Sequence, residues 1–474
     1  MLTSKIFAVK LFKHIFILLA TGLLFTGCED YLEAELPNNE LLEEEALESK
    51  EDVLQVLNSC YDVNANVFNG KVQYAHELLG DNLSMLNESG DLGQIYNRNV
   101  SIFNGVVDGL LADLYRTVFR CNRIEEVVGD FDFSPAEEAR VIAELQTLRA
   151  LSHFEIVKLW AQPAGYTANN SHPGIIYRTE TSVTVLPRPS VAETYNNILA
   201  DLTAAVNSNA LSVNNPYAIS AGAAEALLAK VYFQLGDYSN ALLHADNVIN
   251  SGAYRLDTTI DRFQTDTANL SEIIFKTRSF VTSTINDPRS GDFTGNYRTD
   301  LPQPPFLRAS ADFYEDYAED TLDSRVTELF EVINADTPDE FVGVKKFNKP
   351  YFDVPILHLT DLKLLRAECL TLLNQDLNTA TQDVNDIRER AYGNSSANVP
   401  AGVPANALLE EVRKERRIEM FGEGDRVQQL KRRGAFEDDQ LMIRDVIWNC
   451  DGMILQFPGV ERTELFDINP QGGC

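Results

Sequence analysis

Basic residues are scarce in this chain of 474 residues. Lys and Arg total 40 against 71 Asp and Glu, so the formal net charge is −31 at pH 7. A surface of that sign repels a phosphate backbone and an anionic membrane face. The composition therefore argues against nucleic acid as a partner. It also requires any membrane attachment to come from a lipid or an apolar anchor.

Sequence motifs of catalysis and metal binding are lacking as well. The 6 His residues form no His-Glu-x-x-His and no His/Cys cluster with zinc spacing, and there is no Walker loop, Gly-x-Gly-x-x-Gly or Gly-x-Ser-x-Gly. His153 and Glu155 begin like a deaminase motif, but no Pro-Cys-x-x-Cys follows, which favours an interior helical His. We expect no enzyme, no cofactor and no metal site; a structural Ca²⁺ in an acidic loop is possible but not predicted.

Long apolar runs are missing except near the N-terminus. The run from Ile15 to Phe25 follows three lysines and is shorter than the ~20 residues that a membrane-spanning helix needs. It leads into Phe25-Thr26-Gly27-Cys28, which resembles a bacterial lipobox with Phe25 in place of the usual Leu. The sequence predicts a lipoprotein signal peptide over 1–27 and lipidation at Cys28. An ordinary cleaved signal is the alternative.

Cysteines are few, and their number in the mature chain is odd. Exported proteins mature in oxidising surroundings where cysteines can pair, so at least one must stay free or pair outside the chain. Cys369 lies in a helical stretch and is expected to be a small buried hydrophobe. Cys450 with Cys474 is one plausible bridge, but the sequence leaves the connectivity open. The five cysteines after Cys28 are Cys60, Cys121, Cys369, Cys450 and Cys474.

Helical periodicity dominates what the chain does contain. Apolar residues recur every three or four positions, which is typical of amphipathic helices. Long segments rich in Gly, Pro, Asn and Thr separate them, and loops of that length are usually functional. The expected helices are 43–64, 105–128, 135–160, 191–205, 221–234, 240–250, 361–374, 379–390 and 407–433, and the irregular segments are 66–104, 162–189, 254–306 and 336–355.

One segment has the pattern of a repeated helix pair. In 224–245 a first helix ends near Gly236, and the next presents Ala241 and Ala245 at a spacing of four. Small residues at that spacing let two helices approach closely, as in tetratricopeptide repeats. A degenerate copy lies in 362–390. The pattern predicts a scaffold of stacked helix pairs.

Charged residues are densest in 415–426. Glu415-Arg416-Arg417-Ile418-Glu419 is followed closely by Glu423 and Arg426. Functional carboxylates need a cleft and a perturbed pKa, whereas ion pairs between neighbouring helices need only proximity. We therefore expect this cluster to hold the helix to its neighbours rather than to catalyse a reaction.

A series of short motifs follows a fixed order along most of the chain. They are Cys28-Glu29-Asp30-Tyr31-Leu32, Pro187-Arg188-Pro189-Ser190-Val191, Asp323-Ser324-Arg325, Glu415-Arg416-Arg417-Ile418-Glu419 and Glu423-Gly424-Asp425-Arg426. Each is weak alone, but their order resembles that of the SusD/RagB family of outer-membrane nutrient-binding lipoproteins. The chain departs from the family at His358, where Arg is usual, and at Asp361, where Glu is usual.

The resemblance implies a fold and a location. The fold is mainly all-α, a tetratricopeptide-like helix-pair scaffold with long loop-rich insertions and minor β. The domains are then a signal peptide at 1–27, an acidic tether at 28–42 and a single SusD-like domain at 43–474. The mature protein would sit on the extracellular face of the outer membrane, held by its lipid anchor.

The resemblance also implies a function and partners. The protein would capture oligosaccharides for nutrient uptake and deliver them to a SusC-like TonB-dependent outer-membrane transporter. Three alternatives stay open: a peptide-binding member of the same family, a surface glycan hydrolase, since 71 acids make chance carboxylate pairs abundant, and a scaffold for protein partners.

Ligand contacts are expected in the loops 76–104 and 280–306. Sugar rings stack on aromatic faces while Asn, Asp and Arg bind the hydroxyls. The chain has only 2 Trp, so such a platform must use Tyr and Phe. The candidate ligand-binding residues are Asp81, Asn82, Asp91, Tyr96, Asn97, Arg98, Asn286, Arg289, Phe293, Tyr297 and Arg298.

Overall fold

The computed structural model of this chain describes residues 47–213, 215–264 and 271–474. The predicted signal peptide, Cys28 and the tether 28–42 lie outside the described residues. Contacts divide the chain after Asp52, and Val53–Cys474 forms one compact unit.

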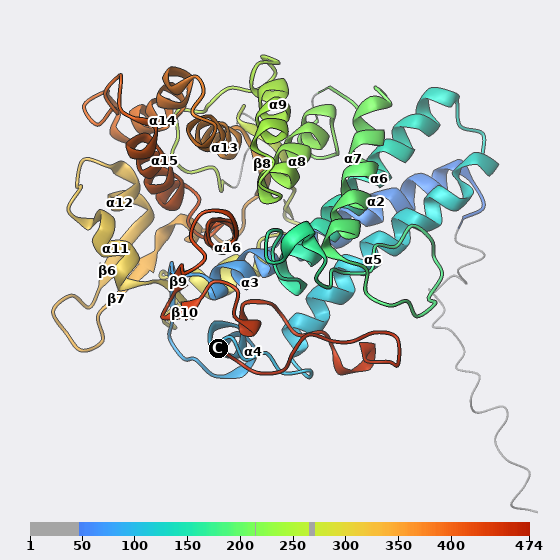
Figure 1. Cartoon of the computed structure of the whole chain (residues 1–474), viewed down its shortest axis with the longest axis horizontal. Coiled ribbons are helices and arrows are strands. Elements are labelled where there is room, and N and C mark those ends of the chain that lie inside the picture. The colour runs from blue at the N-terminus through green and yellow to red at the C-terminus, as the bar shows by residue number, and fades with distance from the viewer. Residues whose placement is uncertain (1–46, 214, 265–270) are drawn as a thin grey trace, which may run out of the picture. The chain divides into compact units, whose positions relative to one another are not determined.

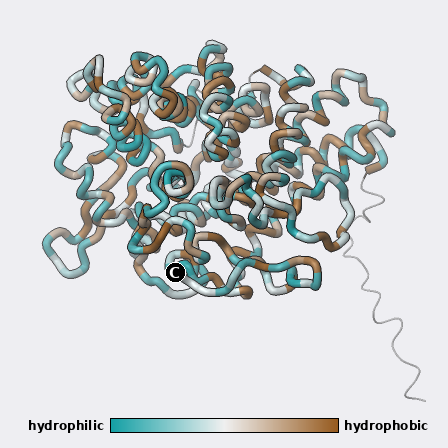
Figure 2. Tube along the Cα trace, in the orientation of Figure 1, coloured by the Kyte–Doolittle hydropathy of each residue, from teal (hydrophilic) through white to brown (hydrophobic). Residues whose placement is uncertain are grey.

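Helices make up most of the described chain, which confirms the mainly helical prediction (Figure 1). Brown and teal alternate along many of them in Figure 2, as expected of helices with one apolar face. Their bounds are α2 Lys50–Val67, α3 Lys71–Leu79, α4 Gly90–Tyr96, α5 Gly105–Val127, α6 Pro135–Trp160, α7 Val191–Asn207, α8 Ala221–Gln234, α9 Tyr238–Ile249, α10 Gly291–Tyr297, α11 Ala311–Ala318, α12 Ser324–Leu329, α13 Leu359–Leu372, α14 Leu377–Tyr392, α15 Ala405–Glu419 and α16 Arg426–Phe436.

Local capping fixes where the two best-predicted helices begin. The Ser134 hydroxyl accepts from the Glu137 N–H, and the Glu137 carboxylate accepts from the Ser134 N–H at 3.0 Å. Ser190 and Glu193 repeat this reciprocal arrangement at the start of α7. Each box satisfies two backbone donors that the first helical turn leaves unpaired.

The helices pack as neighbours in series. Contacts join α5 to α6, α6 to α7, α7 to α8, α8 to α9, α9 to α13 and α13 to α14, and Figure 1 shows this row. The predicted pair over 224–245 is α8 with α9. Ala241 and Ala245 are fully buried there, and Gly236 turns the chain between the helices with φ +75°. A Cβ at Gly236 would lie 2.9 Å from the Phe436 ring, so this turn requires glycine.

Strands are short and all pair antiparallel. One sheet has the order β1-β5-β7-β6, formed by Leu83–Met85, Leu307–Ala309, Phe341–Val344 and Phe330–Ile333. Three two-stranded sheets pair β2 (Ile273–Thr277) with β8 (Val354–His358), β3 (Phe280–Val281) with β4 (Asn286–Asp287), and β9 (Met442–Ile443) with β10 (Val446–Ile447). The helix-poor segments are therefore partly β structure.

Sequence predictions of where helices lie were wrong in several places. The segment 254–306 was expected to be irregular but contains α10. The segment 66–104 was expected to be irregular but contains α3, β1 and α4. The single helix expected over 407–433 is two helices, α15 and α16. The break has a backbone cause, because Gly422 and Gly424 adopt φ +76° and φ +81°, a left-handed conformation that no helix interior accepts.

An aromatic cluster anchors the irregular segments to the core. Phe293 lies 5.7 Å from Phe263, 4.6 Å from Phe347 and 5.7 Å from Phe352 between ring centroids. Tyr297 joins the cluster, with its ring centroid 5.0 Å from that of Phe347. All five side chains are at most 1 % exposed. Burial of such rings supplies much of the stability of this part of the fold.

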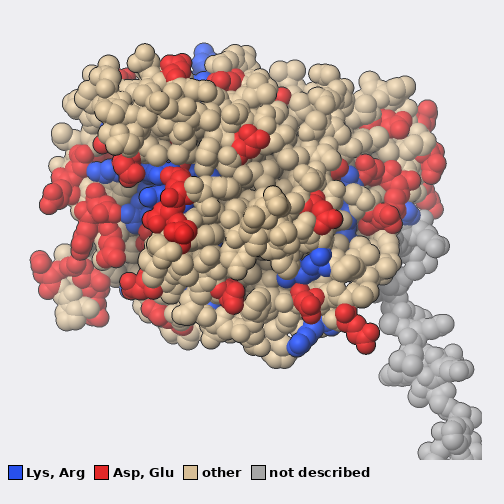
Figure 3. Space-filling model, viewed as in Figure 1, with Lys and Arg blue, Asp and Glu red and all other residues tan. Residues whose placement is uncertain are grey.

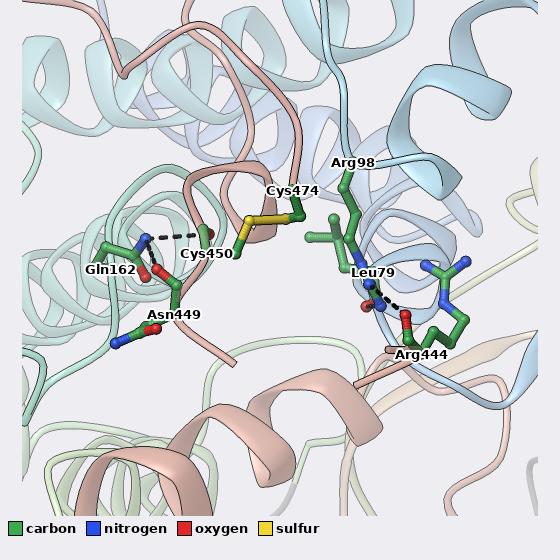
Figure 4. The surroundings of a disulfide bond; sticks show 7 residues. All are labelled: Leu79, Arg98, Gln162, Arg444, Asn449, Cys450 and Cys474. Atoms are coloured by element: carbon green, nitrogen blue, oxygen red, sulfur yellow. Dashed lines mark hydrogen bonds between the residues drawn. A yellow bond between two sulfur atoms is a disulfide. The ribbon is translucent and has the colours of Figure 1, made fainter. Parts of the chain in front are cut away.

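Of the five cysteines after Cys28, two form a disulfide and three are free, which agrees with their odd number. Cys450 and Cys474 form a disulfide that ties the C-terminal residue back to the chain (Figure 4). Cys369 is free and buried in α13, which confirms that it is a small buried hydrophobe. Cys60 and Cys121 are also free and buried, with their sulfur atoms 4.0 Å apart.

The charge-dense segment 415–426 is structural, as predicted. Arg416 donates to Asp425, which lies between α15 and α16, at 2.7 Å, and to Asp361 of α13 at 2.5 Å. Glu419 accepts from Arg390 of α14 at 2.6 Å. Glu423 accepts from Lys346 at 2.7 Å. These pairs hold the end of α15 to three other segments of the chain.

Candidate ligand-binding groove

A groove of about 750 Å³ opens beside α2 and is called the α2 groove below. Its walls are one face of α2, the first turns of α6, the described residues of 212–218, the end of β2 with the start of β3, and Arg289. These segments are far apart in the sequence. Tertiary packing therefore creates a hollow that no single motif encodes.

Tyr61 stands in the floor of the groove in a fixed orientation. Its hydroxyl donates to the Glu144 carboxylate at 2.7 Å and accepts from the Ile219 N–H at 3.0 Å. Its ring meets Phe275 edge-on, with centroids 6.3 Å apart. Burial and the adjacent Glu144 carboxylate raise the pKa of Tyr61 well above its ordinary value. Tyr61 is therefore a protonated aromatic side chain that is held in one orientation in the groove lining.

Two aromatic rings and two cations lie close together in the groove lining. The Lys276 ammonium lies 4.5 Å from the Tyr217 ring centroid, and the Arg278 guanidinium lies 5.2 Å from it. Arg278 also lies 4.8 Å from the centroid of Phe280, whose side chain is 45 % exposed. Stacking of this kind keeps long cationic side chains against the rings. The wall therefore offers an exposed ring and oriented donors side by side.

The predicted residue Arg289 lines this groove. Its guanidinium donates to Asp287 at 2.7 Å and to the Asn66 amide oxygen at 3.2 Å, and it pairs with Asp62 of α2. Asn286 lies in β4, where it pairs with Val281 of the neighbouring strand, and its side chain is exposed. Of the eleven predicted residues, Arg289 is the one in the described lining of the groove.

Asp81 and Asn82 bind arginines of the charge-dense segment instead. Asp81 accepts from Arg426 at 2.7 and 2.8 Å, and the Asn82 amide oxygen accepts from Arg417 at 3.0 Å. Burial favours the neutral form of Asp81, but Arg426 and Arg417 outweigh it and lower the pKa of this carboxyl. Both side chains are occupied within the fold.

The α4 region holds four further predicted residues close together. The Arg444 guanidinium lies 4.0 Å from the Tyr96 ring centroid. The Asn97 amide donates to the Glu88 carbonyl at 3.1 Å, and Asp91 accepts from the Val106 N–H at 3.3 Å. Arg98 is 4 % exposed and donates to the Leu79 carbonyl at 3.2 Å and to the Arg444 carbonyl at 3.4 Å (Figure 4). Asn97 is exposed, and Asp91 and Tyr96 are partly exposed.

The last three predicted residues are engaged within the fold. Phe293 and Tyr297 are 0 % exposed in the aromatic cluster, so neither offers a face for a sugar ring in this structure. Arg298 donates to Asp300 at 2.8 and 2.6 Å. The two predicted loops therefore do not form one continuous site.

Sequence reasoning missed most of the groove residues, among them Tyr61, Tyr217, Arg278 and Phe280. Tyr61 lies on a helix, where an aromatic is expected to be core. Tyr217 follows Asn215 and Pro216, a turn signal between two helices that could have marked a surface aromatic. Arg278 follows a buried strand and carries no local signature.

The arrangement suits binding of planar and hydroxyl-rich groups. Rings of Tyr217 and Phe280 can stack, while guanidinium and amide groups donate to ligand oxygens.

Within 47–213, 215–264 and 271–474, no group of three or more His, Cys, Asp or Glu side chains could hold a metal ion. No helix of these described residues is both long enough and apolar enough to cross a bilayer.

Sequence comparison links the chain to one family through two separate regions. A model of the SusD family matches residues 344–446, and a model described as starch-binding associating with outer membrane matches residues 30–233. Among curated proteins, SusD-like protein P25 of Formosa agariphila is 23 % identical over 87 % of this chain and 88 % of the relative.

Solved structures share the fold over almost the whole chain. A SusD superfamily protein from Bacteroides thetaiotaomicron aligns with a TM-score of 0.76 at 22 % identity, covering 89 % of this chain and 100 % of the other. A laminarin-binding SusD-like protein aligns with a TM-score of 0.69 at 19 % identity, covering 90 % and 100 %. Because two SusD-type models together match more than half of the sequence and the fold agrees along the chain, this protein belongs to the SusD family.

Proposed function

We propose that this protein is a cell-surface lipoprotein that captures oligosaccharides and delivers them to a SusC-like TonB-dependent transporter. The α2 groove carries the proposal, since it combines an exposed ring with oriented donors in a space large enough for several sugar units. The starch-binding description of one matching family model and the laminarin-binding structural neighbour support a glycan as the ligand.

Binding without cleavage fits the carboxylates of the groove. Glu144 is engaged by Arg140 and by the Tyr61 hydroxyl, and Asp62 is paired with Arg289. A glycosidase needs one free carboxyl as acid and a second as base or nucleophile across the scissile bond. Neither groove carboxylate is without a partner in the fold, which favours a binding protein over the alternative of a surface hydrolase.

Truncation of an exposed ring tests glycan capture. We expect Phe280→Ala to weaken binding of a retained polysaccharide by roughly 5- to 30-fold, because a lost stacking surface costs about 1–2 kcal/mol. Affinity electrophoresis against a panel of neutral and acidic polysaccharides measures this. The matched control is Phe103→Ala, an exposed ring (82 %) outside the groove. If both variants are retarded equally, the ligand binds elsewhere, and Tyr96 and Asn97 form the next surface to test. If new reducing ends appear during incubation with a polysaccharide, the protein is a hydrolase.

The anchor at Cys28 has its own test. The matched family is described as associating with the outer membrane, and lipidation of Cys28 would supply the attachment that this acidic chain cannot obtain from basic residues. We expect Cys28→Ala to move the protein from the outer-membrane fraction into the soluble fraction, measured by fractionation and immunoblotting. Cys369→Ala is the matched control. An unchanged membrane fraction for Cys28→Ala would refute the lipid anchor.

A further inference from the structure

The lining of the α2 groove carries the opposite charge to the chain as a whole. Its side chains include Arg140, Lys276, Arg278 and Arg289 but only two carboxylates, Asp62 and Glu144. The chain has a formal net charge of −31, and Figure 3 shows more acidic than basic side chains on the face in view. A concentration of cations in one hollow of so acidic a protein points to a ligand that is itself negative.

Most of these cations already have a carboxylate partner. Arg140 pairs with Glu144, Arg289 with Asp62 and Asp287, and Lys276 lies 3.4 Å from Asp353. Arg278 differs from them. Within the described part of the chain, no carboxylate forms a salt bridge with Arg278, and its side chain is exposed. One full positive charge in the groove is therefore available to a ligand.

Aromatic contacts hold Arg278 in a defined place. Its guanidinium lies 4.8 Å from the Phe280 centroid and 5.2 Å from the Tyr217 centroid, within the groove lining. A guanidinium held against rings keeps its planar edge for two parallel hydrogen bonds to a carboxylate or sulfate. The same rings offer stacking surface, so one ligand unit can meet a ring and a cation together.

We propose that the α2 groove selects acidic oligosaccharides, with Arg278 binding the carboxylate or sulfate group of a sugar unit that stacks beside it. This inference rests on the proposed glycan capture and goes further by naming the charge of the ligand. Carboxylate and sulfate share the required chemistry, and both accept two hydrogen bonds from one guanidinium.

Isothermal titration with three soluble probes tests the inference: polygalacturonate oligomers, their carboxyl-reduced neutral counterparts, and sulfated galactan oligosaccharides. We expect at least one acidic probe to bind ten-fold or more tightly than the neutral one, and the carboxylate and sulfate arms tell which anion is preferred. Arg278→Gln should remove that preference and Arg278→Lys should restore only part of it, because Lys keeps the charge without the planar fork. The matched control is Arg255→Gln, which removes an exposed arginine that does not line the groove.

The outcomes separate this inference from the proposed function. If neutral and acidic probes bind equally and Arg278→Gln changes neither, the selection of acidic ligands is overturned while glycan capture stands. If no polysaccharide of either charge binds the full chain, glycan capture itself fails. Tighter binding of an acidic probe that weakens with added salt and disappears in Arg278→Gln, but not in Arg255→Gln, supports the inference.

Discussion

Arg325→Met is expected to lower the free energy of unfolding by about 3–5 kcal/mol, since it would leave buried carboxylates without their counter-charge. Arg325 is 1 % exposed at the start of α12. It donates to Asp323 at 2.7 Å and to Glu419 at 2.9 Å, and it pairs with Glu415. Three acids from two segments thus depend on one guanidinium. The shift in the urea unfolding midpoint measures the effect.

A surface pair of the same chemistry provides the control. Arg298 donates to Asp300, whose side chain is 47 % exposed, so Arg298→Met should cost less than about 1 kcal/mol. Glu419→Gln tests the same network of ion pairs from its acidic side. It removes one negative charge while keeping the side-chain shape, and it should also lower the free energy of unfolding because its arginine partners lose that counter-charge. A midpoint for Arg325→Met no lower than that of Arg298→Met would contradict a stabilising role for the buried pairs.

The helical scaffold was predictable where local rules and tertiary packing agree. Ser134 and Ser190 cap α6 and α7 at the expected positions, and α8 has the predicted bounds because its small residues also suit the contact with α9. Helix α3 escaped prediction for a physical reason. Eight of its nine residues are buried, and they include the polar Gln73, His76 and Glu77, so its polar positions do not mark a side that faces solvent. The break before α16 depends on left-handed glycines, which a sequence pattern does not reveal.

The candidate site was less predictable because burial of aromatics is a tertiary property. Phe293 and Tyr297 lie in a segment whose composition is that of a loop, yet they complete an aromatic cluster with Phe347. Conversely, Tyr61 belongs to a helix but faces a groove. The groove is assembled from segments more than 200 residues apart, and only their packing brings Tyr61 near Phe275. Arg289 was found because it is a polar residue in the predicted loop 280–306.

A large pH effect is expected from Glu77 of α3, a fully buried carboxyl. Its Oε1 accepts from the Gly424 N–H at 3.0 Å, and its Oε2 has no hydrogen-bond partner among the described residues. Burial, with smaller contributions from Asp425 and Asp81, raises the pKa of Glu77 to about 8, from 4.5. Glu77 is therefore protonated in the folded protein at neutral pH.

The sign of the pH dependence follows from proton counting. Between pH 4.5 and about 8 the unfolded chain has released the Glu77 proton while the folded chain retains it. The folded state binds more protons there, so the free energy of unfolding falls as pH rises, by about 1.4 kcal/mol per unit for this group. Above pH 8 the loss, about 5 kcal/mol in all, is complete.

Glu77→Gln should remove this loss, because the amide oxygen can still accept from Gly424 and carries no charge to bury. Its stability relative to the parent chain is expected to rise from pH 5 to pH 9 by about 3–4 kcal/mol. Urea unfolding at the two pH values measures that difference. Glu88→Gln, an exposed acid in the same region, should follow the parent profile at both. Parallel profiles for the parent and Glu77→Gln would mean that Glu77 ionises normally, and that Gly424 is held by a carboxylate rather than by a protonated acid.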